Sequence, residues 1–96
     1  MSGYLMKAAG AEAEACIDWR QGYLEPGEYV DADLGWSIMP AGDLGDPVIA
    51  CQSFDDRASH ARVRSGVPGR FYMLCARAAT NTGRMLERAI VLRIAA

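Results

Sequence analysis

Apolar and polar residues alternate with a period of two in several short segments of this chain, and each segment ends at a cluster of Gly, Pro or Asp. This alternation is typical of β-strands that have one buried and one exposed face. No segment shows a convincing helical period. The pattern therefore predicts an all-β fold of six to seven short strands, arranged as a two-sheet β-sandwich or a small barrel.

The segment from Glu12 to Trp19 shows how the buried face is identified. One face carries Ile17 and Trp19, and the opposite face carries Cys16 and three carboxylates. Burying three unpaired carboxylates would cost far more free energy than burying Cys16 would gain. We therefore expect Ile17 and Trp19 in the core.

The same rule predicts the other strands and the rest of the core. Strands are expected at residues 31–38, 48–54, 61–65, 70–79 and 86–94, with a type II turn at Pro26-Gly27 and a hairpin tip at 81–83. The predicted structural core consists of Ile17, Trp19, Leu34, Trp36, Val63, Tyr72, Leu74, Ile90 and Leu92.

A chain of 96 residues has room for one small domain with a modest core. We expect this domain to span residues 11–96, and residues 1–10 to form an N-terminal arm that is either flexible or a first edge strand. The apolar runs are too short to cross a bilayer, and the first residues lack the apolar stretch of a secretory signal. The sequence therefore predicts no membrane contact.

The cysteines and the histidine argue against a metal centre. Cys16, Cys51 and Cys75 are widely spaced without a Cys-x-x-Cys pair, and His60 is the only histidine. A structural zinc needs about four nitrogen or sulfur ligands. We expect no metal, no cofactor and reduced thiols, with a bridge between Cys16 and Cys75 across two sheets as the alternative.

Charge is divided unevenly between the two halves of the chain. Residues 1–48 hold nine acids with only Lys7 and Arg20, whereas residues 49–96 hold eight arginines and three acids. Strands from the two halves could interleave and pair their charges, or the acidic side of one subunit could meet the basic side of its neighbour. A basic face for nucleic acid is the weakest interpretation, because the net charge is -2 and the arginines lie on several strands without interleaved aromatics.

The segment from Ser53 to His60 contains Ser, Asp and His, the residue types of a catalytic triad. A triad needs a base within hydrogen-bond reach of the nucleophile and an oxyanion site nearby, and neighbours in one polar loop rarely converge in that way. We predict no catalytic residue. A small hydrolase would require His60 to lie beside Ser53 or Ser59.

Phe71, Met73 and Cys75 form an apolar stripe on the strand face opposite the predicted core. If one face is core, the other is an exposed patch, and such patches often mark contacts with partners. The alternative is that residues 1–10 or a loop cover the stripe. The strand at 61–65 has a basic outer face. The candidate interface residues are Phe71, Met73, Arg62 and Arg64.

Four short motifs follow one another along nearly the whole chain. The first is Tyr4-Leu5 with Lys7, and the second is Ile17-Asp18-Trp19 with Leu24 and Trp36. The third is the segment 61–72, in which Ser65-Gly66 begins a turn and Gly69 stands three residues before Tyr72. The fourth is Thr80-x-x-Gly83-Arg84, followed by Glu87-Arg88. In order and spacing these motifs resemble the phage fiber-tail adaptor family, which are small virion proteins of tailed phages. The chain departs from the family pattern at Ala8-Ala9, where Asp-Pro is usual, and at Val67, where a second turn glycine is usual.

The resemblance implies an immunoglobulin-like sandwich and a structural role without enzymatic activity. The implied partners are other phage structural proteins of the neck, tail or fiber, with this chain as a homo-oligomer in the virion after synthesis in the host cytoplasm. Tyr72 would serve as a tyrosine corner, with its hydroxyl bonded to a nearby backbone group. The alternative function is a carbohydrate- or ligand-binding β-sandwich that uses Tyr23, Tyr29 or Phe54.

Overall fold

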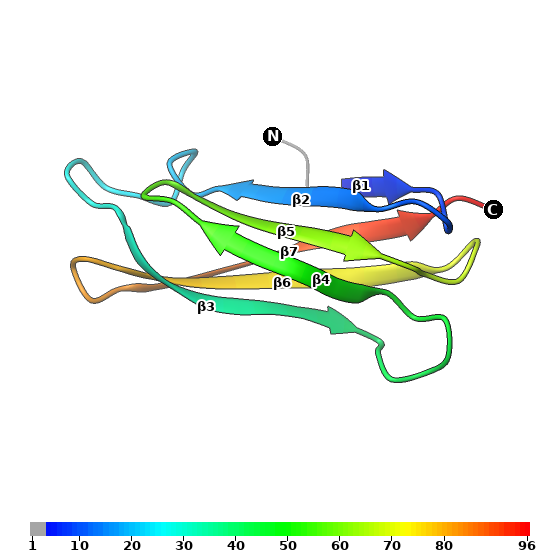
Figure 1. The fold of residues 1–96 in the computed structure, drawn as a ribbon. Helices are drawn as coiled ribbons and strands as arrows, with labels where there is room; N and C mark the ends of the chain where they lie inside the picture. The colour runs from blue at the N-terminus through cyan, green and yellow to red at the C-terminus, as the bar shows by residue number, and fades with distance from the viewer. Residues whose placement is uncertain (1–3) are drawn as a thin grey trace.

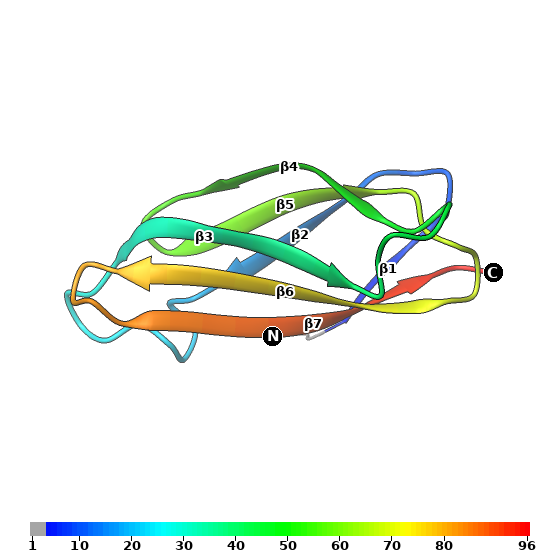
Figure 2. The same ribbon diagram turned by 90° about the horizontal axis from the view of Figure 1, so that it is seen from below.

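The computed structural model describes residues 4–96, which form seven strands in two packed sheets. The strands are β1 (Tyr4–Lys7), β2 (Ala13–Asp18), β3 (Val30–Met39), β4 (Val48–Phe54), β5 (Ala58–Arg64), β6 (Phe71–Thr80) and β7 (Met85–Ile94). One sheet has the order β1-β7-β6-β3 and the other the order β2-β5-β4 (Figure 1). Figure 2 shows β4 and β5 on one side of the molecule and β6 and β7 on the other. The prediction of an all-β two-sheet sandwich is confirmed.

The core lies between the two sheets and follows the alternation of the strands. In β6, buried and exposed residues alternate from Phe71 to Met73, and then the small buried residues Ala76 and Ala78 allow the opposite sheet to approach. The predicted core residues that the structure buries are Ile17, Trp19, Val63, Tyr72, Leu74, Ile90 and Leu92. The indole Nε1 of Trp19 donates a hydrogen bond to the buried Ser59 hydroxyl at 2.9 Å, so the polar atom of the largest core side chain is satisfied.

The prediction that Leu34 lies in the core is wrong, because 44% of this residue is exposed. The pairing of β3 with β6 shifts register between Asp33 and Gly35, which leaves Leu34 as an extra residue. Such a bulge interrupts the alternation of faces and turns the extra side chain away from the core. Beyond the bulge, Trp36 is only half-buried and packs against the edge of the core.

The predicted turn and hairpin chemistry is present in the loops. Gly27 has a φ of 80°, and the amide of Glu28 donates to the carbonyl of Glu25 at 2.9 Å, as in a type II turn with Pro26-Gly27 at its centre. Gly83 has a φ of 86° at the end of the hairpin between β6 and β7. Both positions favour glycine because other residues rarely adopt these angles.

At the end of the sandwich where β6 begins, Tyr72 connects two loops. Its hydroxyl accepts a hydrogen bond from the amide of Val67 at 3.3 Å and donates one to Asp46 at 2.9 Å. The hydroxyl therefore bonds a nearby backbone group, as the family resemblance implies. Beside it, Gly66 has a φ of 121°, and a Cβ atom there would overlap the Ile94 side chain.

Residues 4–7 of the predicted N-terminal arm form β1, which pairs in parallel with β7 at the edge of the four-stranded sheet. Lys7 is buried, and its ammonium donates to the carbonyls of Ala8 at 2.8 Å and Ala11 at 2.7 Å. Burial lowers the pKa of this ammonium. Residues 1–3 of the predicted arm lie outside the described residues. Within residues 4–96, no helix is long and apolar enough to cross a membrane.

Candidate functional site

The outer face of the four-stranded sheet carries a group of large apolar side chains. Phe71 and Met73 point away from the core, and the sheet register places Met39 of β3 beside Met73. We call this surface the apolar face; it comprises Tyr4, Met6, Met39, Phe71, Met73 and Met85. The exposed fractions run from 43% for Met73 to 70% for Met39, so residues 4–10 leave the face open. Exposed apolar patches often mark contacts with partners.

A cation without an ion-pair partner among the described residues lies within the apolar face. The guanidinium carbon of Arg93 lies 5.5 Å from the centre of the Phe71 ring, in a cation–π contact. The Nε of Arg93 is buried without a hydrogen-bond partner, and Arg93 forms no ion pair within the described part of the chain. Further along the same face, Arg77 pairs with Glu87 at 3.5 Å. Arg93 is thus partly desolvated without a carboxylate of its own.

The outer face of the three-stranded sheet is chemically different. We call it the charged face; it comprises Glu14 and Asp18 of β2 and His60, Arg62 and Arg64 of β5. Its ion pairs join Asp18 to Arg57 at 3.0 Å and Glu12 to Arg62 at 3.9 Å. Acids of the first half of the chain therefore pair with arginines of the second half, as the interleaved-strand interpretation expects.

The four candidate interface residues do not form one surface. Phe71 and Met73 lie on the apolar face, whereas Arg62 and Arg64 lie on the charged face of the other sheet. Sequence alternation identified each pair as outward-facing. It contained no information about which strands share a sheet, so it could not separate them.

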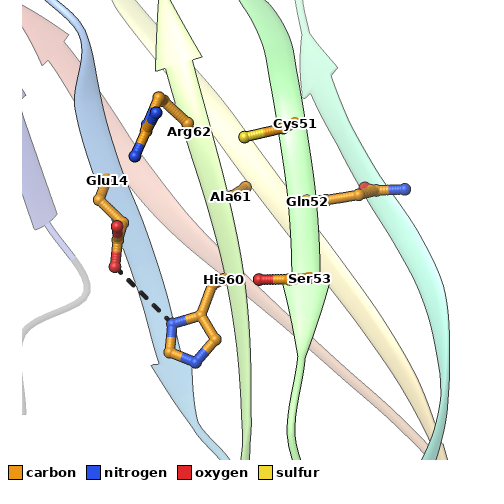
Figure 3. Close-up of a pocket in the computed structure, with 7 residues that line it drawn as sticks. All are labelled: Glu14, Cys51, Gln52, Ser53, His60, Ala61 and Arg62. Carbon is orange, nitrogen blue, oxygen red and sulfur yellow. Dashed lines mark ion pairs between the residues drawn. The ribbon is translucent and has the colours of Figure 1, made fainter.

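A shallow pocket of about 120 Å³ lies on the charged face, and Figure 3 shows the side chains that line it. Ser53 of β4 pairs in register with His60 of β5. The His60 ring lies on the side of Glu14, with 3.8 Å between its Nδ1 and a carboxylate oxygen (Figure 3). Ser59, the other serine considered, is buried and bonded to Trp19. Within residues 4–96, no hydrogen bond joins His60 to either serine, so these groups do not form a nucleophile–base pair.

The carboxylate of Asp55 is hydrogen-bonded within the turn between β4 and β5. It accepts hydrogen bonds from the backbone amides of Arg57 and Ala58 at 2.9 Å each, and it lies 3.3 Å from Nε2 of His60. The amide of Arg57 is the main reason that the pKa of Asp55 lies below its ordinary value. Within the described residues, no three His, Cys, Asp or Glu side chains gather to hold a metal ion.

The three cysteines are unpaired. Cys16 is exposed on the outer side of β2 and Cys75 is half-buried on the outer side of β6, so the two thiols lie on opposite faces of the sandwich. The alternative of a bridge across the two sheets is therefore wrong. Burial and nearby carboxylates raise the pKa of both thiols, which favours their neutral form.

The aromatic residues considered for ligand binding are not gathered in the pocket. Tyr23 packs edge-on against the buried Trp19, with 5.3 Å between ring centres. Tyr29 and Phe54 are partly exposed beside β3 and at the end of β4, and neither lines the pocket. Tyr23 therefore contributes to the core.

Sequence analysis missed the ion pair between Glu28, which lies just before β3, and Arg84, which lies in the hairpin between β6 and β7. The Glu28 carboxylate accepts hydrogen bonds from the hydroxyls of Thr80 at 2.6 Å and Thr82 at 2.7 Å, and from Nε of Arg84 at 2.9 Å. These contacts fasten the turn before β3 to the hairpin between β6 and β7. The available signal was the Thr-x-Thr-Gly-Arg motif at 80–84, in which several donors occur together.

Comparison with known protein families gives a match over nearly the whole chain. Residues 7–93 match the model of a family described as podophage GP4 fiber-tail adaptor protein gp77. A comparison with curated proteins finds no match. The matched range includes six of the seven strands completely or nearly so, together with most of both outer faces.

Proposed function

Because this chain belongs to the podophage fiber-tail adaptor protein family, we propose that it joins its partners through the two outer faces of its sandwich. The protein is a structural component of the phage tail, an adaptor between tail and fibers, and not an enzyme. The observation that carries the proposal is the chemical difference between the apolar face and the charged face. Two unlike surfaces allow one small subunit to bind partner proteins through one face and to form permanent contacts through the other.

The sandwich holds the two faces in a fixed relation. The buried side chains of both sheets interlock between them, and Tyr72 and Glu28 fix the loops at opposite ends. A close-packed interior transmits force with little deformation. Such a rigid scaffold suits an adaptor under mechanical load, because it keeps the bound partners in fixed positions relative to each other.

We assign the charged face to the tail and fiber proteins and the apolar face to contacts that stay buried in the particle. Charged surfaces give specificity and fast association, since complementary potentials select the partner. Apolar surfaces of this extent favour permanent interfaces. We also propose that several copies act together as a homo-oligomer, because repeated contacts multiply weak affinities.

The proposed unit is the sandwich of residues 11–96, to which residues 1–10 add an edge strand. The pairing of β1 with β7 supports this division. We further infer that the sandwich is immunoglobulin-like. The orders β7-β6-β3 and β2-β5-β4 correspond to strands G-F-C and B-E-D of that fold, which supports the inference.

Affinity capture from phage lysates tests the assignment of the faces. The variant Arg62→Glu with Arg64→Glu reverses charge on the charged face, and we expect it to retain tail and fiber proteins at least about tenfold less than the wild type. The variant Leu44→Ser is the control, because Leu44 is fully exposed in the loop between β3 and β4 and lies on neither face. Retention of both partner proteins by the charge-reversed variant, with its circular dichroism unchanged, would contradict the assignment.

A further inference from the structure

We propose that the apolar face is where two copies of this chain form a twofold dimer. This inference deepens the proposed function, from which it takes only the premise that the apolar face is a contact surface. We infer that the partner is a second copy of this chain. The same face carries both the apolar area and the carboxylate that its unpaired cation requires from a partner.

The apolar face is large enough for a stable dimer. The strands β3, β6 and β7 each contain ten residues, which extend about 33 Å, and three strands span about 14 Å. The four residues of β1 add a short edge, so the flat area of the outer side of this sheet is on the order of 500 Å². Side chains that stand out from the sheet increase the accessible area. Stable interfaces bury about 800 Å² on each partner.

Arg93 indicates which chemistry the partner must bring. Its Nε is already removed from solvent without a hydrogen-bond partner, and its guanidinium lies over the ring of Phe71. Covering the face with a purely apolar partner would bury this charge without compensation, which costs several kcal/mol. The partner surface must therefore be apolar with a carboxylate at a matching position.

A second copy of the same face provides that carboxylate. Glu87 lies on the outer side of β7, six positions before Arg93, and the pair Ile90–Leu74 lies midway between them. We place a twofold axis at this midpoint, between the two facing sheets and perpendicular to the strand direction. This axis stacks the β7 strands of the two copies on each other in antiparallel directions. Arg93 of one copy then faces Glu87 of the second copy, and Met73 faces Cys75 of the second copy.

The same axis places the remaining residues in compatible surroundings. Phe71 comes opposite Arg77 of the second copy, which allows a second cation–π contact. Each Glu87 lies between two arginines, its own Arg77 at 3.5 Å and Arg93 of the second copy. The two charged faces then point in opposite directions, so the dimer can hold one partner protein on each side.

Charge reversal across the proposed axis tests this geometry. In sedimentation velocity, we expect the wild type to dimerise, and we expect Arg93→Glu and Glu87→Arg each to raise the dimer dissociation constant about tenfold or more. The double variant restores opposite charges at the two facing positions and should bring the constant below that of either single variant, but not fully to the wild-type value, because Arg77 then has no carboxylate beside it. The double variant can recover dimerisation only if the two positions face each other across the axis. If either residue had a merely structural role, the second charge change would not restore dimerisation.

Arg64→Glu, on the charged face, is the matched control and should dimerise like the wild type. Met73→Asp should be monomeric, with a thermal transition that shows it is folded. A wild type that remains monomeric, a dimer that survives Met73→Asp, or a double variant no better than the single variants would each overturn the proposal. The capture experiment tests the charged face, which is a different surface. Its result therefore does not depend on the outcome of the dimerisation experiment.

Discussion

The Glu28 carboxylate accepts hydrogen bonds from two threonine hydroxyls, the amide of Glu25 and the guanidinium of Arg84, while only 1% of the residue is exposed. All of these donors stabilise the ionised form. The Arg84 guanidinium is the largest cause that holds the pKa of Glu28 far below its ordinary value, with Thr80 next. A buried pair of this kind is costly to break from one side, because the remaining charge is left without a partner.

Glu28 should make the stability of the protein depend on pH in the acid range. Its pKa is lowered on folding, so its contribution is complete above the unfolded value near 4.5 and is lost as the pH falls below it. We expect Glu28→Gln to be less stable than the wild type in urea at pH 7, with a smaller difference at pH 3. Glu12→Gln, which changes an exposed carboxylate, is the control. An equal difference at both pH values would count against this role.

At the scale of the element, β3 and β6 are neighbours of equal length that behave differently. β6 keeps a strict alternation of buried and exposed residues, whereas the register of β3 shifts twice. The second shift is accompanied by a φ of 105° at Gly35, whose amide is held by the Asp33 carboxylate at 3.0 Å. Bulges of this kind also protect an edge strand from unwanted pairing.

This difference between the strands predicts different costs for the same substitution. Leu34→Ala should change the free energy of unfolding by no more than about 0.5 kcal/mol, because Leu34 is exposed at the bulge. Leu74→Ala should cost about 2–5 kcal/mol, because it leaves a cavity between the sheets. Chemical denaturation of both variants provides the comparison, and a similar cost for the two would show that Leu34 is packed.

At the scale of the whole molecule, most ion pairs lie on the charged face or at the sandwich ends, and large apolar side chains gather on the apolar face. The two surfaces should therefore respond differently to salt. Exposed charges are screened by ions, whereas apolar contacts are not.

We expect self-association to persist when NaCl rises from about 0.1 M to about 1 M, which shortens the screening length from about 10 Å to about 3 Å. Sedimentation of the pure chain at the two salt concentrations measures this directly. Contacts between the acidic side of one subunit and the basic side of another would instead dissociate at high salt. That result would favour the two-faced arrangement of charges over the apolar dimer.

The sequence alone determined six of the seven strands to within three residues, together with the turns and most of the core; the strand expected at 61–65 begins earlier, at Ala58, in the segment that was expected to be a loop. Period-two alternation marked Ile17, Trp19 and Leu74 as inward, and glycine and proline marked the turns, because these signals depend only on local backbone geometry. The order of the short motifs also led to the family. Local patterns are sufficient for these features because each involves residues close together in the chain.

Only the tertiary structure decided which strands share a sheet, and with it the separation of Phe71 from Arg62 on opposite faces. It also decided the exposure of Leu34 and the meeting of Glu28 with Arg84, 56 positions apart in the sequence. An alternating strand has two faces whatever its neighbours are. Its partner and its register are set by the packing of distant segments, which no single segment encodes.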